Sequence, residues 1–149
     1  MKILLAIDGS RFSEAATQAV IDRMKTANVE VDVLTVVDLM NYFSDERTAE
    51  EYVPNITQIR LDRLNRASEL VEKIARALRG AGFLVTVGVV EGDPKTEIVA
   101  SAEEWGADVI GVGSHGRYVF DRALPGSVSE AVARHARCSV EIVRSRTER

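Results

Sequence analysis

Two kinds of apolar pattern alternate along this chain of 149 residues, and that alternation limits its fold more than any other feature. Short runs rich in aliphatic and β-branched residues predict five strands, at 2–7, 29–37, 83–90, 107–112 and 138–143. Apolar residues at helical spacing predict helices at 12–24, at 56–78, from 94 onward and at 127–137. Strands that alternate with helices are typical of an α/β fold, so we expect an open five-stranded parallel sheet with helices on both faces.

The order of the strands decides which residues meet. The common orders for a five-stranded sheet of this kind are 3-2-1-4-5 and 2-1-3-4-5, and in both the winding reverses at one place. Ligands bind there, beyond the carboxyl ends of the strands. In the first order strands one and four are neighbours, and Asp8 would then lie beside Gly113.

Residues with known positional preferences mark the ends of the helices. Asp93 and Pro94 fit the N-cap and the first position of the third helix, whereas 80–82 carries two glycines that fit the end of the second. The series Ser127-Val-Ser-Glu130 has the form of a capping box. Residues 38–56 predict a solvated loop, with a lid over a ligand or a partner surface as the alternative.

Charge and composition narrow the class of partner. The chain has 19 Lys and Arg against 23 Asp and Glu, and its formal net charge of −4 argues against a general nucleic-acid binder. The single cysteine, Cys138, excludes a disulfide within the chain. No apolar run approaches the roughly 18 residues of a membrane span, and no signal peptide is recognisable. We therefore expect one domain, residues 1–149, in the cytoplasm and away from membranes.

The stretch 111–129 carries the chemistry. A predicted strand is followed there by a glycine turn, an excursion and the start of a helix. Glycine lets a backbone approach a ligand closely, and the free N–H groups and positive potential of a helix start suit a phosphate. Together these features predict a nucleotide cradle. Its candidate residues are Gly113, Gly116, Arg117, Arg122, Gly126, Ser127 and Ser129.

Two better-known phosphate motifs fit less well. Gly111-x-Gly113-x-x-Gly116 is a literal match to the dinucleotide fingerprint, but it follows the fourth strand rather than the first. Asp38 ends the second strand, where a ribose-binding acid would lie, yet it follows the wrong glycines. A P-loop needs Gly-Lys-Ser or Gly-Lys-Thr, and no lysine precedes Ser127.

The spacing Gly113-x2-Gly116-x9-Gly126-Ser127 resembles the ATP-binding pattern of the universal stress protein family, G-2x-G-9x-G-(S/T). The opening residues 3–10, Ile-Leu-Leu-Ala-Ile-Asp-Gly-Ser, look like the first strand of that family. The resemblance covers nearly the whole chain. Its other landmarks are similar to residues 36–38, 92–94 and 107–116.

The resemblance implies a Rossmann-like sheet of order 3-2-1-4-5, of the adenine nucleotide alpha hydrolase-like type, and a homodimer paired through Cys138 to Val143. It implies the nucleotide-binding kind of member, with ATP or alternatively AMP as ligand and Mg²⁺ on the phosphates. Adenine and ribose would lie at Asp8 and near the backbone of Ala6 and Val36. The residues implied around the phosphates are Gly113, Gly116, Gly126, Ser127, Val128 and Ser129. Val112 and Arg117 are further candidates for contact with the nucleotide.

Several of these residues also have purely structural interpretations. Asp8 would otherwise cap the first helix or close a turn, since Asp-Gly-Ser is ordinary turn chemistry. His115 lies between two glycines, but without a partner base a loop or phosphate-proximal role is favoured over catalysis. His135 and Cys138 are too few for a zinc site, and Cys138 fits a small buried hydrophobe.

We therefore expect a nucleotide-dependent regulator or sensor of stress. One competing hypothesis is a slow Mg²⁺-dependent ATPase, in which Asp8 holds the metal and Arg117 or Arg122 clamps phosphate. The other is an interaction module that binds AMP or no nucleotide. Efficient phosphoryl transfer needs a positioned base, and no residue stands out as that base, so we do not expect an enzyme.

Overall fold

The computed structural model describes residues 1–39, 56–115 and 126–145. Residues 40–55, most of the predicted loop or lid, lie outside the described residues. The elements in chain order are β1 (Lys2–Ala6), α1 (Arg11–Arg23), β2 (Glu30–Val37), α4 (Ile56–Gly80), β3 (Leu84–Glu91), α5 (Pro94–Trp105), β4 (Val109–Gly113), α6 (Ser127–His135) and β5 (Ser139–Val143).

The strands form one five-stranded sheet in the order β3-β2-β1-β4-β5. All four pairings are parallel, with Leu5 opposite Val33 of β2 and opposite Gly111 of β4. The α/β class, the parallel sheet and the order 3-2-1-4-5 are therefore confirmed, and the alternative order is excluded. Because β1 lies between β2 and β4, the first and fourth strands are neighbours as expected.

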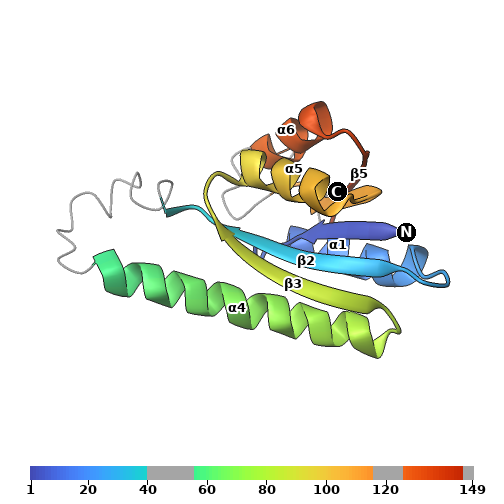
Figure 1. Ribbon diagram of the computed structural model, residues 1–149, viewed down its shortest axis with the longest axis horizontal. Helices are drawn as coiled ribbons and strands as arrows, with labels where there is room; N and C mark the ends of the chain where they lie inside the picture. The colour runs from blue at the N-terminus through green and yellow to red at the C-terminus, as the bar shows by residue number, and fades with distance from the viewer. Residues whose placement is uncertain (40–55, 116–125, 146–149) are drawn as a thin grey trace.

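Helices cover both faces of the sheet (Figure 1). On one face the core cluster joins the strands to α1 and α4, and on the other it joins them to α5 and α6. Alternation along β1 supplies both clusters, because Ile3 and Leu5 belong to the first and Leu4 to the second. All three side chains are 0% exposed, and burying each contributes about 1.5–3 kcal/mol.

The two edge strands are more open than the centre. β3 leaves Leu84 62% exposed and Val87 36% exposed, and β5 leaves Ile142 37% exposed. Each edge strand has a neighbouring strand on one side only, so its side chains are covered less completely than those of the central strand β1.

The observed ends of several elements differ from the predicted ones by a few residues. α4 runs to Gly80 rather than ending before it, and Gly82 takes the positive φ of 98° that follows the helix. α6 ends at His135 rather than at residue 137, because Ala136 has extended backbone with a ψ of 143°. The strands begin or end one or two residues from their predicted limits.

No helix among the described residues is long and apolar enough to cross a membrane.

Candidate nucleotide-binding site

The carboxyl ends of β1, β2 and β4 lie at one edge of the sheet, because the strands are parallel. β1 ends at Ala6, with Asp8 two residues beyond it, and β4 ends at Gly113. The predicted neighbours Asp8 and Gly113 therefore follow adjacent strands at the edge where α/β sheets bind ligands.

Asp8 is half-buried and closes the turn that leads into α1. Its Oδ1 accepts a hydrogen bond from the Ser10 N–H at 2.9 Å. The helix itself is capped by Ser10, whose Oγ accepts from the Ser13 N–H at 3.2 Å. Among the described residues, no donor is hydrogen-bonded to Oδ2 of Asp8, so this oxygen is available to a ligand hydroxyl or a cation.

The end of β1 is tied to β2 by a residue that sequence reasoning did not single out. Thr35 is 5% exposed, and its hydroxyl donates to the carbonyl of Ile7, while the Ile7 N–H donates to the Leu34 carbonyl at 2.9 Å. These bonds fix the backbone immediately before Asp8. A threonine in a strand is ordinary, so the sequence held no signal of this role.

Four predicted ligand-contact residues gather on the α5 and α6 side of this edge. Ala6 and Val112 are buried in the core cluster of that face, at 9% and 3% exposed. Val36 and Val128 are partly buried and pack against the same cluster. Residues from β1, β2, β4 and α6 thus pack into one apolar cluster at this edge of the sheet.

Gly113 is required by the approach of α1. A Cβ atom on Gly113 would lie 2.6 Å from the carbonyl carbon of Phe12 and 2.7 Å from its oxygen. Backbone atoms in the first turn of a helix cannot move aside cheaply. The glycine therefore lets the end of β4 contact the start of α1 directly.

Gly126 makes the matching contact at the start of α6. Its N–H donates to the Ser114 carbonyl at 2.7 Å, and a Cβ there would lie 2.9 Å from that oxygen. The Ser129 hydroxyl lies 3.0 Å from the carbonyl oxygens of both Ser114 and Gly126, which share its single proton as acceptors. The turn after β4 is thus fastened to the first turn of α6. Sequence reasoning passed over Ser114 because its contribution is a backbone carbonyl.

The first hydrogen bond of α6 runs from the Glu130 N–H to the Gly126 carbonyl at 3.0 Å. The N–H groups of Ser127, Val128 and Ser129 precede that bond and have no hydrogen-bond partner among the described residues. They carry the positive end of the helix dipole. The arrangement can receive an anionic group.

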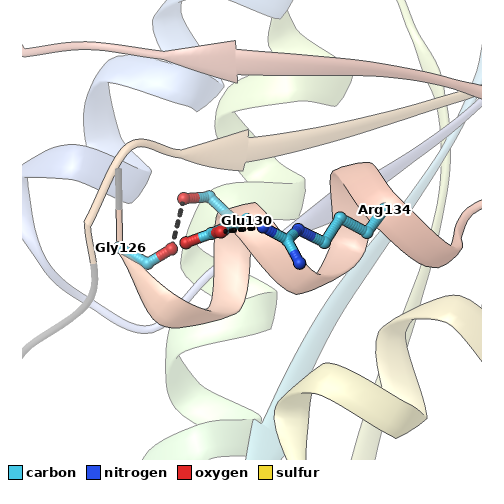
Figure 2. Close-up of polar contacts among 4 residues, drawn as sticks. Gly126, Glu130 and Arg134 are labelled. Carbon is cyan, nitrogen blue, oxygen red and sulfur yellow. Dashed lines mark hydrogen bonds and ion pairs between the residues drawn. The ribbon is translucent and has the colours of Figure 1, made fainter. Parts of the chain in front are cut away.

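The predicted capping box is wrong. The N-cap is Gly126, which has no side chain, rather than Ser127. Glu130 instead pairs with Arg134 one turn further on, with Oε1 at 2.7 Å from the guanidinium nitrogen Nη2 (Figure 2). An i,i+4 ion pair competes with capping for the same carboxylate. The N–H groups at the helix start are consequently left to other partners.

His115 lies inside the turn rather than on its surface. It is 8% exposed, its ring centroid lies 5.1 Å from that of Phe12, and its Nδ1 lies 3.1 Å from Ser114 Oγ. Gly116, Arg117 and Arg122 lie outside the described residues. In the described part of the chain, no group of three or more metal-ligating side chains comes together.

A pocket of about 460 Å³ lies elsewhere, between α5 and the segment 136–138 that follows α6. Ala107, just before β4, and Ile110 near its start both line the pocket, so the pocket lies at the opposite end of that strand from Gly113. Cys138 in its wall is half-buried rather than buried as predicted, and this partial burial raises the pKa of its thiol. The lining residues are Val99, Ala102, Glu103, Gly106, Ala107, Ile110, Ala136, Arg137 and Cys138.

The sequence profile of the universal stress protein family matches residues 1–144. The chain therefore belongs to the universal stress protein family. It is 32% identical over 143 residues to universal stress protein MJ0531 of Methanocaldococcus jannaschii, covering 96% of this chain and 81% of that protein. Among solved structures, hypothetical protein MJ0577 is 33% identical with a TM-score of 0.81, covering 96% of this chain and 94% of that one.

Two more distant structures share the fold and were determined with nucleotides. A universal stress protein family protein from Arabidopsis thaliana with AMP bound is 16% identical with a TM-score of 0.70, covering 99% of this chain and 94% of that chain. A universal stress protein in complex with cAMP is 21% identical with a TM-score of 0.58, covering 97% of each chain.

Proposed function

We propose that this universal stress protein binds an adenine nucleotide, with ATP as the first candidate, and acts as a nucleotide-dependent regulator or sensor in a stress response. The observation that carries the proposal is the start of α6. Three consecutive N–H groups there precede the helix ladder, and the Gly126 N–H fastens that turn to Ser114 at 2.7 Å. A helix start held beside the carboxyl ends of parallel strands suits a phosphate.

The phosphate half of the proposed site consists of the backbone of Ser127, Val128 and Ser129. The hydroxyl of Ser129 is 3.0 Å from two carbonyls, so that residue would offer a phosphate its N–H rather than its side chain. Ser127 is exposed and would offer both its N–H and its hydroxyl. Gly113, Gly116 and Arg117 stay in the proposal as phosphate neighbours.

The nucleoside half of the proposed site would lie at the carboxyl ends of β1 and β2, on the same face of the sheet as α6. A purine would lie against the half-buried side chains of Val36 and Val128, beside the backbone of Ala6 at the end of β1. Asp8 would accept a hydrogen bond from a ribose hydroxyl through Oδ2. A purine beside these residues and phosphates on the start of α6 would together match the two ends of an adenine nucleotide.

ATP and AMP are the two candidate nucleotides, and different observations favour each. The spacing Gly113-x2-Gly116-x9-Gly126-Ser127 favours ATP. The relatives with AMP and with cAMP favour an adenine base but leave AMP as the alternative ligand. Mg²⁺ would bind chiefly to the phosphates, with Asp8 as the candidate protein ligand. Slow hydrolysis of ATP is the competing activity.

We also propose that the protein is a homodimer and that it is located in the cytoplasm. β5 is an edge strand, and we propose that two copies pair through residues 138–143 in a homodimer. Ile142, 37% exposed on that strand, would be covered on pairing. We keep residues 1–149 as a single domain and the cytoplasm as its compartment; both stay predictions.

Calorimetric titration of nucleotide-stripped protein tests the proposal. ATP, with and without Mg²⁺, is expected to bind near one equivalent per chain, and NAD is expected not to bind. Equal or tighter binding of AMP would move the assignment to AMP. A folded sample that binds neither ATP nor AMP would refute adenine nucleotide binding. Turnover of ATP far above background would replace the sensor with an enzyme.

A further inference from the structure

His115 is a buried titratable side chain that the proposed site does not use directly. Its ring contacts the ring of Phe12 in the first turn of α1, with a centroid distance of 5.1 Å and an angle of 54° between the planes. Its Nδ1 lies 3.1 Å from Ser114 Oγ, and both residues are buried, at 8% and 2% exposed. The side chain thus connects the turn after β4 to α1.

The backbone of His115 supports the start of α6. A Cβ atom on Gly126 would lie 3.0 Å from the Cα of His115 and 2.9 Å from the Ser114 carbonyl oxygen. That spacing leaves no room for a side chain between the turn and the helix. Any displacement of residues 114–115 would therefore displace the first turn of α6.

We infer that His115 is a positioning residue for the phosphate-binding end of α6, and this inference rests on the proposed function. Contact with Phe12 and Ser114 holds the turn, and the turn holds Gly126 through the 2.7 Å bond to its N–H. The N–H groups of Ser127–Ser129 are fixed in place before a phosphate arrives. Donors that are already in place bind more tightly than donors that must be ordered.

Three variants separate this role from general support of the fold. His115→Phe keeps an aromatic ring against Phe12 and removes Nδ1, whereas Ser114→Ala removes the hydroxyl that faces Nδ1. His115→Asn places a polar atom near the position of Nδ1 and is expected to restore part of the loss. His135→Phe is the matched control, because His135 is exposed in the last turn of α6.

Calorimetry with ATP and with adenosine supplies the first readout. In His115→Phe and Ser114→Ala the affinity for ATP is expected to fall about tenfold, the equivalent of one weakened hydrogen bond to a charged group. The affinity for adenosine, which has no phosphate, is expected to stay within about twofold. The control is expected to match the wild-type protein with both ligands. Equal losses for ATP and adenosine, or no loss, would overturn the inference.

Amide NMR of the ligand-free protein supplies a readout that does not depend on nucleotide binding. The resonances of Val128 and Ser129 are expected to move in His115→Phe and to stay in place in His135→Phe. Unmoved resonances would overturn the positioning role even if ATP binds. A wild-type protein that binds neither ATP nor AMP would instead refute the proposed function. If His115→Phe does not fold, Ser114→Ala carries both comparisons.

Discussion

The hydroxyl of Ser129 donates a hydrogen bond to the carbonyl of Ser114 at 3.0 Å, and so joins the first turn of α6 to the end of β4. The same carbonyl accepts from the Gly126 N–H at 2.7 Å, while the Ser114 N–H donates to the Val143 carbonyl at 2.8 Å. One peptide segment therefore connects β4, β5 and α6. The position of the proposed phosphate site depends on this junction.

Replacing Ser129 tests how firmly the junction is held. Ser129→Ala removes the one hydroxyl proton that the carbonyls of Ser114 and Gly126 share, from a residue that is 2% exposed, so the free energy of unfolding should fall by about 1–2 kcal/mol. Ser129→Thr keeps a hydroxyl and should lose less. Urea denaturation gives the values, with Ser127→Ala on the exposed face of the same helix as control. Equal losses for Ser129→Ala and Ser127→Ala would show that the bonds contribute nothing.

Gly113→Ala should destabilise the fold whether or not a nucleotide binds. The new Cβ would lie 2.6 Å from the Phe12 carbonyl carbon, and such overpacking costs about 1–3 kcal/mol. Gly80→Ala is the matched control, because a Cβ there meets nothing within 4 Å and alanine favours the helix. Denaturation curves should show a loss for the first variant and no loss, or a small gain, for the second. A stable Gly113→Ala protein would contradict the contact with α1.

Ser127→Pro removes one N–H group from the start of α6. Proline is well tolerated at the first position of a helix, and α5 already begins with Pro94. The melting temperature should therefore change little, while the affinity for ATP should fall by about tenfold. Calorimetry with ATP and with adenosine distinguishes the two halves of the site. Undiminished ATP binding would mean that this N–H does not face a phosphate.

Alkylation of the Cys138 thiol should require a higher pH in the folded protein than in the unfolded chain. Burial raises the pKa of this thiol, so the folded chain holds the thiol proton more tightly than the unfolded chain. The associated stability is complete below the pKa of the unfolded state and is lost as the pH rises through the folded pKa. Iodoacetamide labelling of the native protein should therefore reach its half-maximal rate at a higher pH than labelling in urea. Coincident profiles would contradict the burial of the thiol.

The apolar pattern predicted the fold because nearly every strand and helix has a face that must be covered. β1 is the clearest case: Ile3, Leu4 and Leu5 are all 0% exposed, which only a sheet covered on both sides allows. The ends of the helices were harder to predict. The carboxylate of Glu130 could either cap the start of α6 or pair with Arg134, and in the structure it pairs with Arg134.

The site was predictable in its place but only partly in its contacts. The glycines at 113 and 126 indicated a close approach to the backbone at both positions. In the structure α1 approaches Gly113, and residues 114–115 approach Gly126. Thr35 donates a hydrogen bond to the carbonyl of Ile7, and the carbonyl of Ser114 accepts one from Ser129. Such bonds between side chains and backbone leave no periodic signal in a sequence. The roles of Gly116 and Arg117 stay predictions.

The central claim is that the phosphates of a nucleotide bind at the start of α6. The most direct test is an ATP and Mg²⁺ titration of isotope-labelled protein, followed by amide NMR. The claim predicts saturable shifts at Asp8, Ser127, Val128 and Ser129. Shifts confined to Ala136 and Cys138, which line the pocket beside α5, or no shifts at all, would contradict it.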